Sequence, residues 1–308
     1  MAPSDEDSAN ESAEELTPAE QEEAEELSAV RAHVVHAAIL SEGHQELELS
    51  TFPLAFSGLA AGLSMGFSLV AQGVLFTNLP DAVWRPLIVK SGYAIGFLIV
   101  ILGRQQLFTE KTLTAVLPLF EHPDRRTFMN VARLWCTVLA ANLVGTLIFA
   151  WVLSATSVFD TETKKSFSHI ASESLGHPFG VVFLSAIFAG WLIALLVWLL
   201  PFGDTEKVGV IVIITYMVGI SHFSHIIAGS VNVLYLLLSG QATASDYFLR
   251  FLIPTLLGNC VGGVALVAAL GRAQVVGGKA NSIEPGVRRT GETEKKKPAN
   301  KSSSRRHE

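Results

Sequence analysis

The chain has 308 residues, of which half are hydrophobic and 16% are charged. A soluble domain carries about a quarter charged residues, so this composition excludes an ordinary soluble globular protein. The net charge of −6 is the difference between two unlike tails: residues 1–30 hold eleven Asp or Glu and no Lys or Arg, whereas residues 272–308 hold ten Lys or Arg and four Glu.

The N-terminal region is predicted to have two parts. Residues 1–27 are too polar and too acidic to bury a core, and we expect a disordered acidic tail there. Residues 28–50 are predicted to form an amphipathic helix lying at a membrane surface. Its three histidines, His33, His36 and His44, are interpreted as solvated surface residues.

Six apolar stretches follow, free or nearly free of charged residues. They are 52–79, 86–120, 134–159, 178–203, 208–245 and 251–271. Each is long enough to cross a hydrocarbon core as a helix, which takes about 20 residues, and none shows the alternation of a barrel strand. The sequence therefore predicts an all-α membrane protein with six transmembrane helices at 51–272, followed by a basic disordered tail at 273–308.

The distribution of Lys and Arg predicts the orientation. An even number of crossings puts both termini on one side, where the basic tail joins Arg125, Arg126 and Arg133. Loops rich in Lys and Arg stay in the cytoplasm, so both termini are predicted to be cytoplasmic in a cell inner membrane. Lys164 and Lys165 in the opposite loop count against this assignment.

Two of the stretches are too long for one straight crossing. Residues 208–245 would make a helix of roughly 57 Å, and residues 86–120 are of similar length. Polar residues interrupt each of them, in "GRQQLFTEK" at 103–111 and in "SHFSH" at 221–225. Irregular backbone at membrane depth is tolerated where it lines a cavity, so we predict broken second and fifth helices.

A short internal echo accompanies these breaks. "ANLVGTL" at 141–147 matches "GNCVGGV" at 258–264, which sets Asn142 and Asn259 117 residues apart. Three crossings per half require the second half to enter from the opposite side, so the pattern predicts an inverted 3+3 repeat. Gly258 and Gly262 form a GxxxG step, which is typical of close helix packing.

Three segments carry a family resemblance. "LFT" at 107–109, "FSHIIAGS" at 223–230 and "LIPTLLGNCVGG" at 252–263 resemble the formate/nitrite transporter family, in its less-characterised inner-membrane branch. The resemblance covers about residues 50–272. It implies an aquaporin-like fold and a homopentamer in which each protomer has its own pore for small monovalent anions such as formate, nitrite or hydrosulfide.

The resemblance also implies roles for individual residues. Asn259 and its flanking glycines match the structural last helix, and His225 matches a central histidine that faces Thr109. The positions matching the cytoplasmic constriction and the pore lining around it are Leu107, Phe108, Thr109, Tyr93 and Phe97.

Three positions depart from the family pattern. Gly190 stands where better-known members have Asn, Val218 stands where an aromatic residue guards the outer constriction, and Ser224 replaces an acidic residue. A wider or differently selective pore is the expected consequence.

Ionisable residues within membrane spans are costly and are functional by default. Imidazole titrates near neutral pH, so His225 is predicted to protonate a weak-acid anion in transit, and the neutral acid then crosses apolar constrictions more cheaply. His222 lies on the same helical face, either as a second pathway residue or as a structural one. Arg104 either attracts anions or extends to the interface. Lys90 is interpreted as an interfacial charge, an interpretation also open for Glu110 and Lys111.

Other functions are less compatible with the sequence. Two histidines do not supply the three or four ligands of a zinc site, so neither a metal nor a cofactor is predicted, and no nucleophile motif indicates an enzyme. The expected partners are a small monovalent anion, a proton and membrane lipid, with no nucleic acid. A neutral-solute pore of the aquaporin or glycerol type remains the alternative within transport. A non-conducting scaffold with partner-binding tails is the alternative outside it.

Overall fold

A computed structural model of the chain describes residues 34–202 and 206–280, and all regular structure in these ranges is helical. The predicted acidic tail at 1–27, His33 and residues 281–308 lie outside the described residues. The last helix continues to Ala280, past the boundary predicted at residue 272.

The helices have the following bounds in chain order. They are an N-terminal helix whose described part is 34–48, α2 (Thr51–Met65), α3 (Phe67–Asn78), α4 (Arg85–Ser91), α5 (Tyr93–Leu102), α6 (Phe108–Thr114), α7 (Val116–Glu121), α8 (Arg125–Ala155), α9 (Thr161–Ser172), α10 (Phe179–Leu199), the 3₁₀ turn η1 (Leu200–Phe202), α11 (Lys207–Ile220), α12 (Ile226–Leu238), the π-helical turn η2 (Asp246–Leu252) and α13 (Ile253–Ala280).

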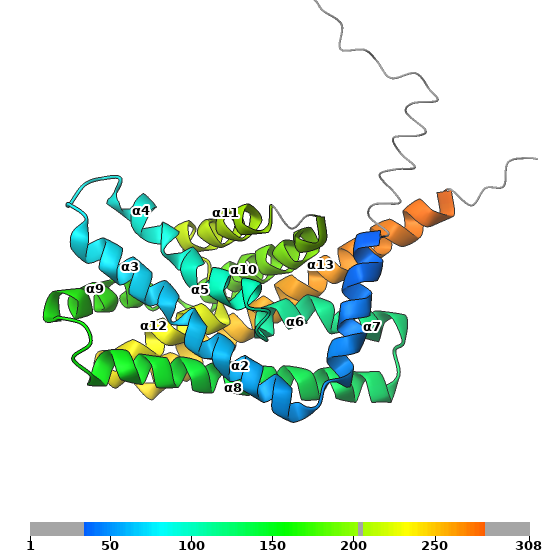
Figure 1. Ribbon diagram of the computed structural model, residues 1–308, viewed down its shortest axis with the longest axis horizontal. Coiled ribbons are helices and arrows are strands. Elements are labelled where there is room, and N and C mark those ends of the chain that lie inside the picture. The colour runs from blue at the N-terminus through cyan, green and yellow to red at the C-terminus, as the bar shows by residue number, and fades with distance from the viewer. Residues whose placement is uncertain (1–33, 203–205, 281–308) are drawn as a thin grey trace, which may run out of the picture.

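Within the described residues, five helical segments are long and apolar enough to cross a membrane. They are Thr51–Asn78, Arg85–Leu102, Arg125–Ala155, Phe179–Leu199 and Asp246–Leu266. The apolar helices α11 and α12 are each shorter than a crossing, and they are the two parts of the predicted broken fifth helix. In Figure 1 the long helices run across the view, with α9 at one end and the N-terminal helix at the other. The six-helix prediction is confirmed.

Both long stretches are broken where the polar residues predicted it. The first break separates α5 from α6 and the second separates α11 from α12. Each contains one non-glycine residue with a left-handed backbone, Arg104 at φ 48° and His222 at φ 53°. The next amide in each break bonds back to the preceding helix, from Gln105 to Val100 at 2.9 Å and from Phe223 to Val218 at 3.0 Å. The two halves therefore repeat one backbone pattern.

Asn142 holds the first break to its neighbours. Its Oδ1 accepts the Phe108 backbone N–H at the start of α6, at 2.9 Å. Its Nδ2 donates to the carbonyls of Gly58 at 2.7 Å and Gln106 at 2.9 Å. A buried helix end needs such partners because its terminal N–H groups have none inside the helix.

Asn259 makes the equivalent contacts in the second half. Its Oδ1 accepts the Ile226 N–H at 2.9 Å, and its Nδ2 donates to the carbonyls of Ala186 at 2.8 Å and Ser224 at 2.9 Å. The sequence echo thus corresponds to two asparagines that each join a broken helix to the two crossings beside it, as an inverted repeat requires.

Glycines allow the close helix crossings beside these asparagines. A Cβ on Gly62 of α2 would overlap the Asn142 carbonyl oxygen, and one on Gly190 of α10 would overlap that of Asn259. On α13, Gly258 and Gly262 approach the carbonyls of Phe183 and Ile187 equally closely. These positions serve the close helix packing expected of GxxxG steps.

Gly190, predicted to be a pathway residue, lies at a helix crossing. It is buried in the seam between α10 and α13, in the place that Gly62 takes between α2 and α8. The lack of a side chain there permits the close crossing of α10 and α13.

We expect Gly190→Ala to destabilise the protein by about 1–3 kcal/mol, because the new methyl group meets backbone atoms that cannot rotate away. The matched control is Gly180→Ala on the same helix, where nothing lies within 4 Å of the added Cβ. Thermal unfolding of the detergent-solubilised protein measures both. Equal melting temperatures for the two variants would contradict the assignment of Gly190 to the seam.

The N-terminal helix packs on the bundle by one face. Val35 and Ile39 join a buried cluster with Leu117 of α7 and Trp198 of α10. Glu46 is buried as well, forms an ion pair with Lys111 of α6, and accepts a hydrogen bond from Thr114 at 2.9 Å. The helix predicted to lie at a membrane surface is therefore anchored to α6 by a buried charge pair.

Candidate functional site: a polar cavity ending at His225

His225 stands at the N-terminus of α12 with an extended backbone. Its Nδ1 accepts the Ala228 N–H at 3.2 Å, so the side chain caps the helix. An accepting Nδ1 leaves the single proton of a neutral imidazole on Nε2. The side chain is 1% exposed. This burial and its cap bond fix the orientation of Nε2.

Thr109 of α6 meets this nitrogen from the other half of the repeat. Its Oγ1 lies 2.8 Å from His225 Nε2, and the Thr109 side chain is fully buried. Because Nε2 carries the proton, the imidazole donates and the threonine oxygen accepts. The two broken helices therefore meet in one hydrogen bond inside the bundle.

Aromatic and aliphatic side chains surround the His225–Thr109 pair. The Phe97 ring packs edge-on against the imidazole, with centroids 5.0 Å apart, and Tyr93 contacts Phe97 at 5.4 Å. Val218 on α11 is fully buried in the same core cluster as Phe97. Few polar groups in this apolar surrounding, here called the neck, would replace the water around an ion.

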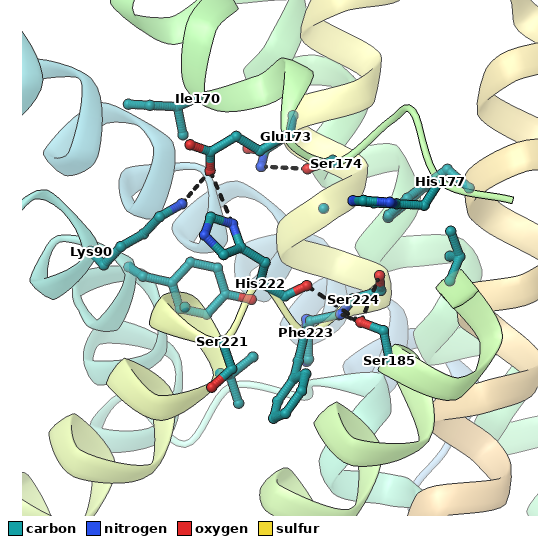
Figure 2. A pocket seen from close by; sticks show the side chains of 18 of the residues that line it. Lys90, Ile170, Glu173, Ser174, His177, Ser185, Ser221, His222, Phe223 and Ser224 are labelled. Carbon is teal, nitrogen blue, oxygen red and sulfur yellow. Dashed lines mark hydrogen bonds and ion pairs between the residues drawn. The ribbon is translucent and has the colours of Figure 1, made fainter. Parts of the chain in front are cut away.

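A cavity of about 230 Å³ leads to His225 from the α9 end of the molecule. Its lining combines apolar side chains with hydroxyl, amide and imidazole side chains from six segments of the chain. These lining residues include Gln72, Tyr93, Ser174, His177, Ser185, Ser221, His222, Ser224, His225 and Asn232. Figure 2 labels Ser174, His177, Ser185, Ser221, His222 and Ser224 among the side chains around the break between α11 and α12. The cavity is large enough for a small anion, and the buried imidazole of His225 is one of its lining side chains.

Three charged or ionisable side chains meet in this cavity. The Glu173 carboxylate, just past the end of α9, forms an ion pair with the Lys90 ammonium. The same oxygen, Oε2, lies 3.4 Å from His222 Nδ1. Figure 2 shows the carboxylate between its two partners. Lys90, interpreted from the sequence as an interfacial charge, is 7% exposed and lines the cavity.

The family model for formate/nitrite transporters matches residues 33–272. The chain belongs to the formate/nitrite transporter family. It is 38% identical over 262 residues to the inner membrane protein YfdC of Escherichia coli strain K12, covering 85% of this chain and 84% of the relative. It is 28% identical to a probable formate transporter of Methanothermobacter thermautotrophicus, covering 70% and 82% of the two chains.

Solved structures of this family share the fold. A pentameric formate channel with formate bound aligns with a TM-score of 0.65 at 22% identity, covering 73% of this chain and 98% of that one. An FNT family ion channel aligns with a TM-score of 0.69 at 20% identity, covering 78% and 99%. The chain is therefore an all-α, multi-pass membrane protein with the aquaporin-like inverted repeat of its family.

Some positions assigned by family resemblance lie away from the cavity. Phe108 is buried with its ring edge-on against Trp135 of α8, and Leu107 is buried in the same core cluster. Arg104 is exposed and is absent from the cavity lining. Its place in the first break corresponds to that of His222 in the second. The anion-attracting role considered for Arg104 has no support from the position of its side chain.

Sequence reasoning missed Glu173 and the helix that carries it. The hydropathy pattern places residues 160–177 in the loop between two apolar stretches, although Asp160 is a typical helix N-cap and is followed by Thr163, Phe167 and Ile170 at helical spacing. In the structure Asp160 Oδ1 accepts the Thr163 N–H at 2.7 Å, and the apolar face of α9 is buried. The cap and the apolar face together place Glu173 at the cavity mouth.

Metal binding has no evident site in the described part of the chain. There, no three or more His, Cys, Asp or Glu side chains are grouped so that they could hold an ion. Glu173 and His222 alone supply two ligands, and the third group beside them is the Lys90 ammonium, which has no lone pair to offer.

Proposed function

We propose that this chain forms a channel for a small monovalent weak-acid anion of the formate, nitrite or hydrosulfide class. The observation that carries the proposal is the buried His225–Thr109 pair at the inner end of a polar cavity, beside an apolar neck. A cavity of this size accepts an ion of a few atoms, and the neck beyond it favours an uncharged species.

The proposed assembly is a homopentamer in a cell inner membrane with both termini cytoplasmic. The pentameric structural neighbour supports the homopentamer, and the inner-membrane relative supports the location in an inner membrane. The cytoplasmic location of both termini is supported by the clustering of Arg125, Arg126 and Arg133 on the same face.

His225 is proposed to supply the proton that neutralises the anion. In this cycle the imidazole takes up a proton from cavity water, gives one proton to the anion, and returns to its neutral form. One anion and one proton thus cross the neck together as the neutral acid. Both nitrogens of an imidazolium are donors, so the Ala228 N–H bond opens while the cation exists, which keeps that state short-lived.

Flux into proteoliposomes tests the proposal directly. Formate, nitrite, hydrosulfide and acetate are presented across about pH 5–8, the range in which imidazole titrates, with glycerol as the neutral comparison. We expect anion flux to rise as the pH falls, because each anion crosses with a proton, and glycerol to be excluded.

Two outcomes would contradict the proposal. Glycerol flux that does not depend on pH would indicate a neutral-solute pore. No flux above protein-free liposomes for any of the five solutes would indicate a non-conducting scaffold.

A further inference from the structure

We propose that Glu173 is an anion-selectivity residue of the cavity mouth: it cancels the charge of Lys90, so that protonation of His222 decides whether the mouth attracts an anion. This inference rests on the proposed channel function and adds to it a group outside the central His225–Thr109 pair.

The three side chains come from separate parts of the fold. Lys90 lies on α4, Glu173 follows α9, and His222 lies in the break between α11 and α12. Both cationic partners contact the same carboxylate oxygen, Oε2. The lysine is almost fully buried and the histidine is half exposed, with 52% of its side chain accessible. The ammonium is therefore held in place, whereas the imidazole can exchange protons with solvent.

The geometry gives a simple charge count. With neutral His222, the Lys90 and Glu173 charges sum to zero. With His222 protonated, the mouth holds one net positive charge. A lone carboxylate would repel anions at every pH and a lone lysine would attract them at every pH. The three together make the attraction conditional on protons outside the cavity.

The other groups facing His222 are few. His177, on the connection between α9 and α10, lines the same cavity and is the second imidazole at its mouth. Tyr93 of α5 and Ser185 of α10 line it as well, and Ser185 Oγ lies 3.3 Å from the His222 carbonyl oxygen. His177 makes no ion pair with Glu173 among the described contacts, so the switch is assigned to His222.

α9 holds Glu173 in position throughout the relevant pH range. Hydrogen bonds from the backbone and side chain of Thr163 lower the pKa of Asp160, the N-cap of α9. Because the pKa of Asp160 is lower in the folded state, the ionised cap stabilises the fold at every pH above the ordinary Asp range. This stabilisation is lost only as the pH falls through the lowered pKa. Acidification within the range in which imidazole ordinarily titrates, about pH 5–8, therefore leaves the cap charged.

The test measures the apparent KM for formate flux into proteoliposomes as a function of external pH. Glu173→Gln adds one positive charge to the mouth at every pH, and we expect the KM at neutral pH to fall about three- to tenfold. Lys90→Met removes one positive charge from the mouth at every pH, and we expect the KM at neutral pH to rise by a similar factor. His222→Gln should make the KM independent of pH at its neutral-pH value.

The double variant Lys90→Met/Glu173→Gln separates charge from packing. It has the wild-type charge count, zero with neutral His222 and one positive charge with the imidazolium, so its KM and pH profile should return toward wild type. A merely structural ion pair would impair both single variants in the same direction, whereas the charge count predicts opposite shifts of the KM in Glu173→Gln and Lys90→Met. The matched control is Glu162→Gln on α9, which removes a carboxylate from an exposed pair with Lys165 outside the cavity and should leave the KM unchanged.

Several results would overturn the inference while the channel function stands. These are wild-type flux with an unchanged KM in both single variants, a double variant worse than either single variant, or loss of the pH dependence in His177→Gln instead of His222→Gln. An absence of formate flux in the wild-type protein would overturn the channel function and this inference together.

Discussion

Replacing His225 with Ala should reduce formate flux about a hundredfold or more and remove its rise at acidic pH. Positioned proton donors contribute about 10²–10⁴ in rate in other systems, and the imidazole is the ionisable group at the inner end of the cavity. Its loss also leaves Thr109 without its partner and the start of α12 without its cap.

His225→Asn is the matched variant for this experiment. Asparagine is a favourable N-cap residue, so it preserves the Ala228 hydrogen bond while removing the titrating group. Both variants should assemble in the membrane, and His225→Asn should keep a melting temperature close to wild type. If either variant kept the wild-type flux and the wild-type pH profile, His225 would not be the proton donor.

Breaking the Glu46–Lys111 pair should produce the largest loss of stability in this chain. Both side chains are less than a tenth exposed, and an uncompensated buried charge costs about 3–5 kcal/mol. Lys111→Met should be the more severe variant, because it leaves Glu46 buried near a second carboxylate, Glu110. Oε1 of Glu110 is buried without a hydrogen-bond partner among the described atoms.

A double substitution distinguishes the pair from its surroundings. Glu46→Leu/Lys111→Met removes both charges, and we expect it to recover most of the stability lost in Lys111→Met, because apolar replacement of a whole buried pair is often neutral. Lys165→Met, which breaks the exposed pair with Glu162, is the control and should cost about 0.5 kcal/mol or less. Equal melting temperatures for Lys111→Met and Lys165→Met in detergent would show that the buried pair does not stabilise the fold.

The pair also links the N-terminal helix to the site. Lys111 lies two residues after Thr109 on α6, whose first turn meets His225. Breaking the pair is therefore expected to displace α6 and with it the Thr109 side chain that contacts His225. Flux measurements on these variants should be normalised to the amount of folded protein.

Much of the fold was determined by the sequence alone. Lipid leaves unpaired backbone groups unsatisfied, so long uncharged stretches must be helices, and the six crossings followed from that requirement. The polar residues at 103–111 and 221–225 marked both breaks, because such residues are tolerated at depth only beside other polar groups. The spacing of Asn142 and Asn259 marked the repeat, whose hydrogen bonds match contact for contact.

The partners of the buried charges were decided by tertiary structure. Lys90 meets Glu173 across 83 residues and Lys111 meets Glu46 across 65, and no periodicity predicts either meeting. The role of Gly190 likewise became clear only from the backbone of α13 lying against it. A hydropathy pattern indicates which face of a helix is buried. Which residue of the facing helix it contacts depends on how the two helices cross. For that reason His225 could be named from the chain, whereas the pairing of Lys90 with Glu173 beside the same cavity required the packed bundle.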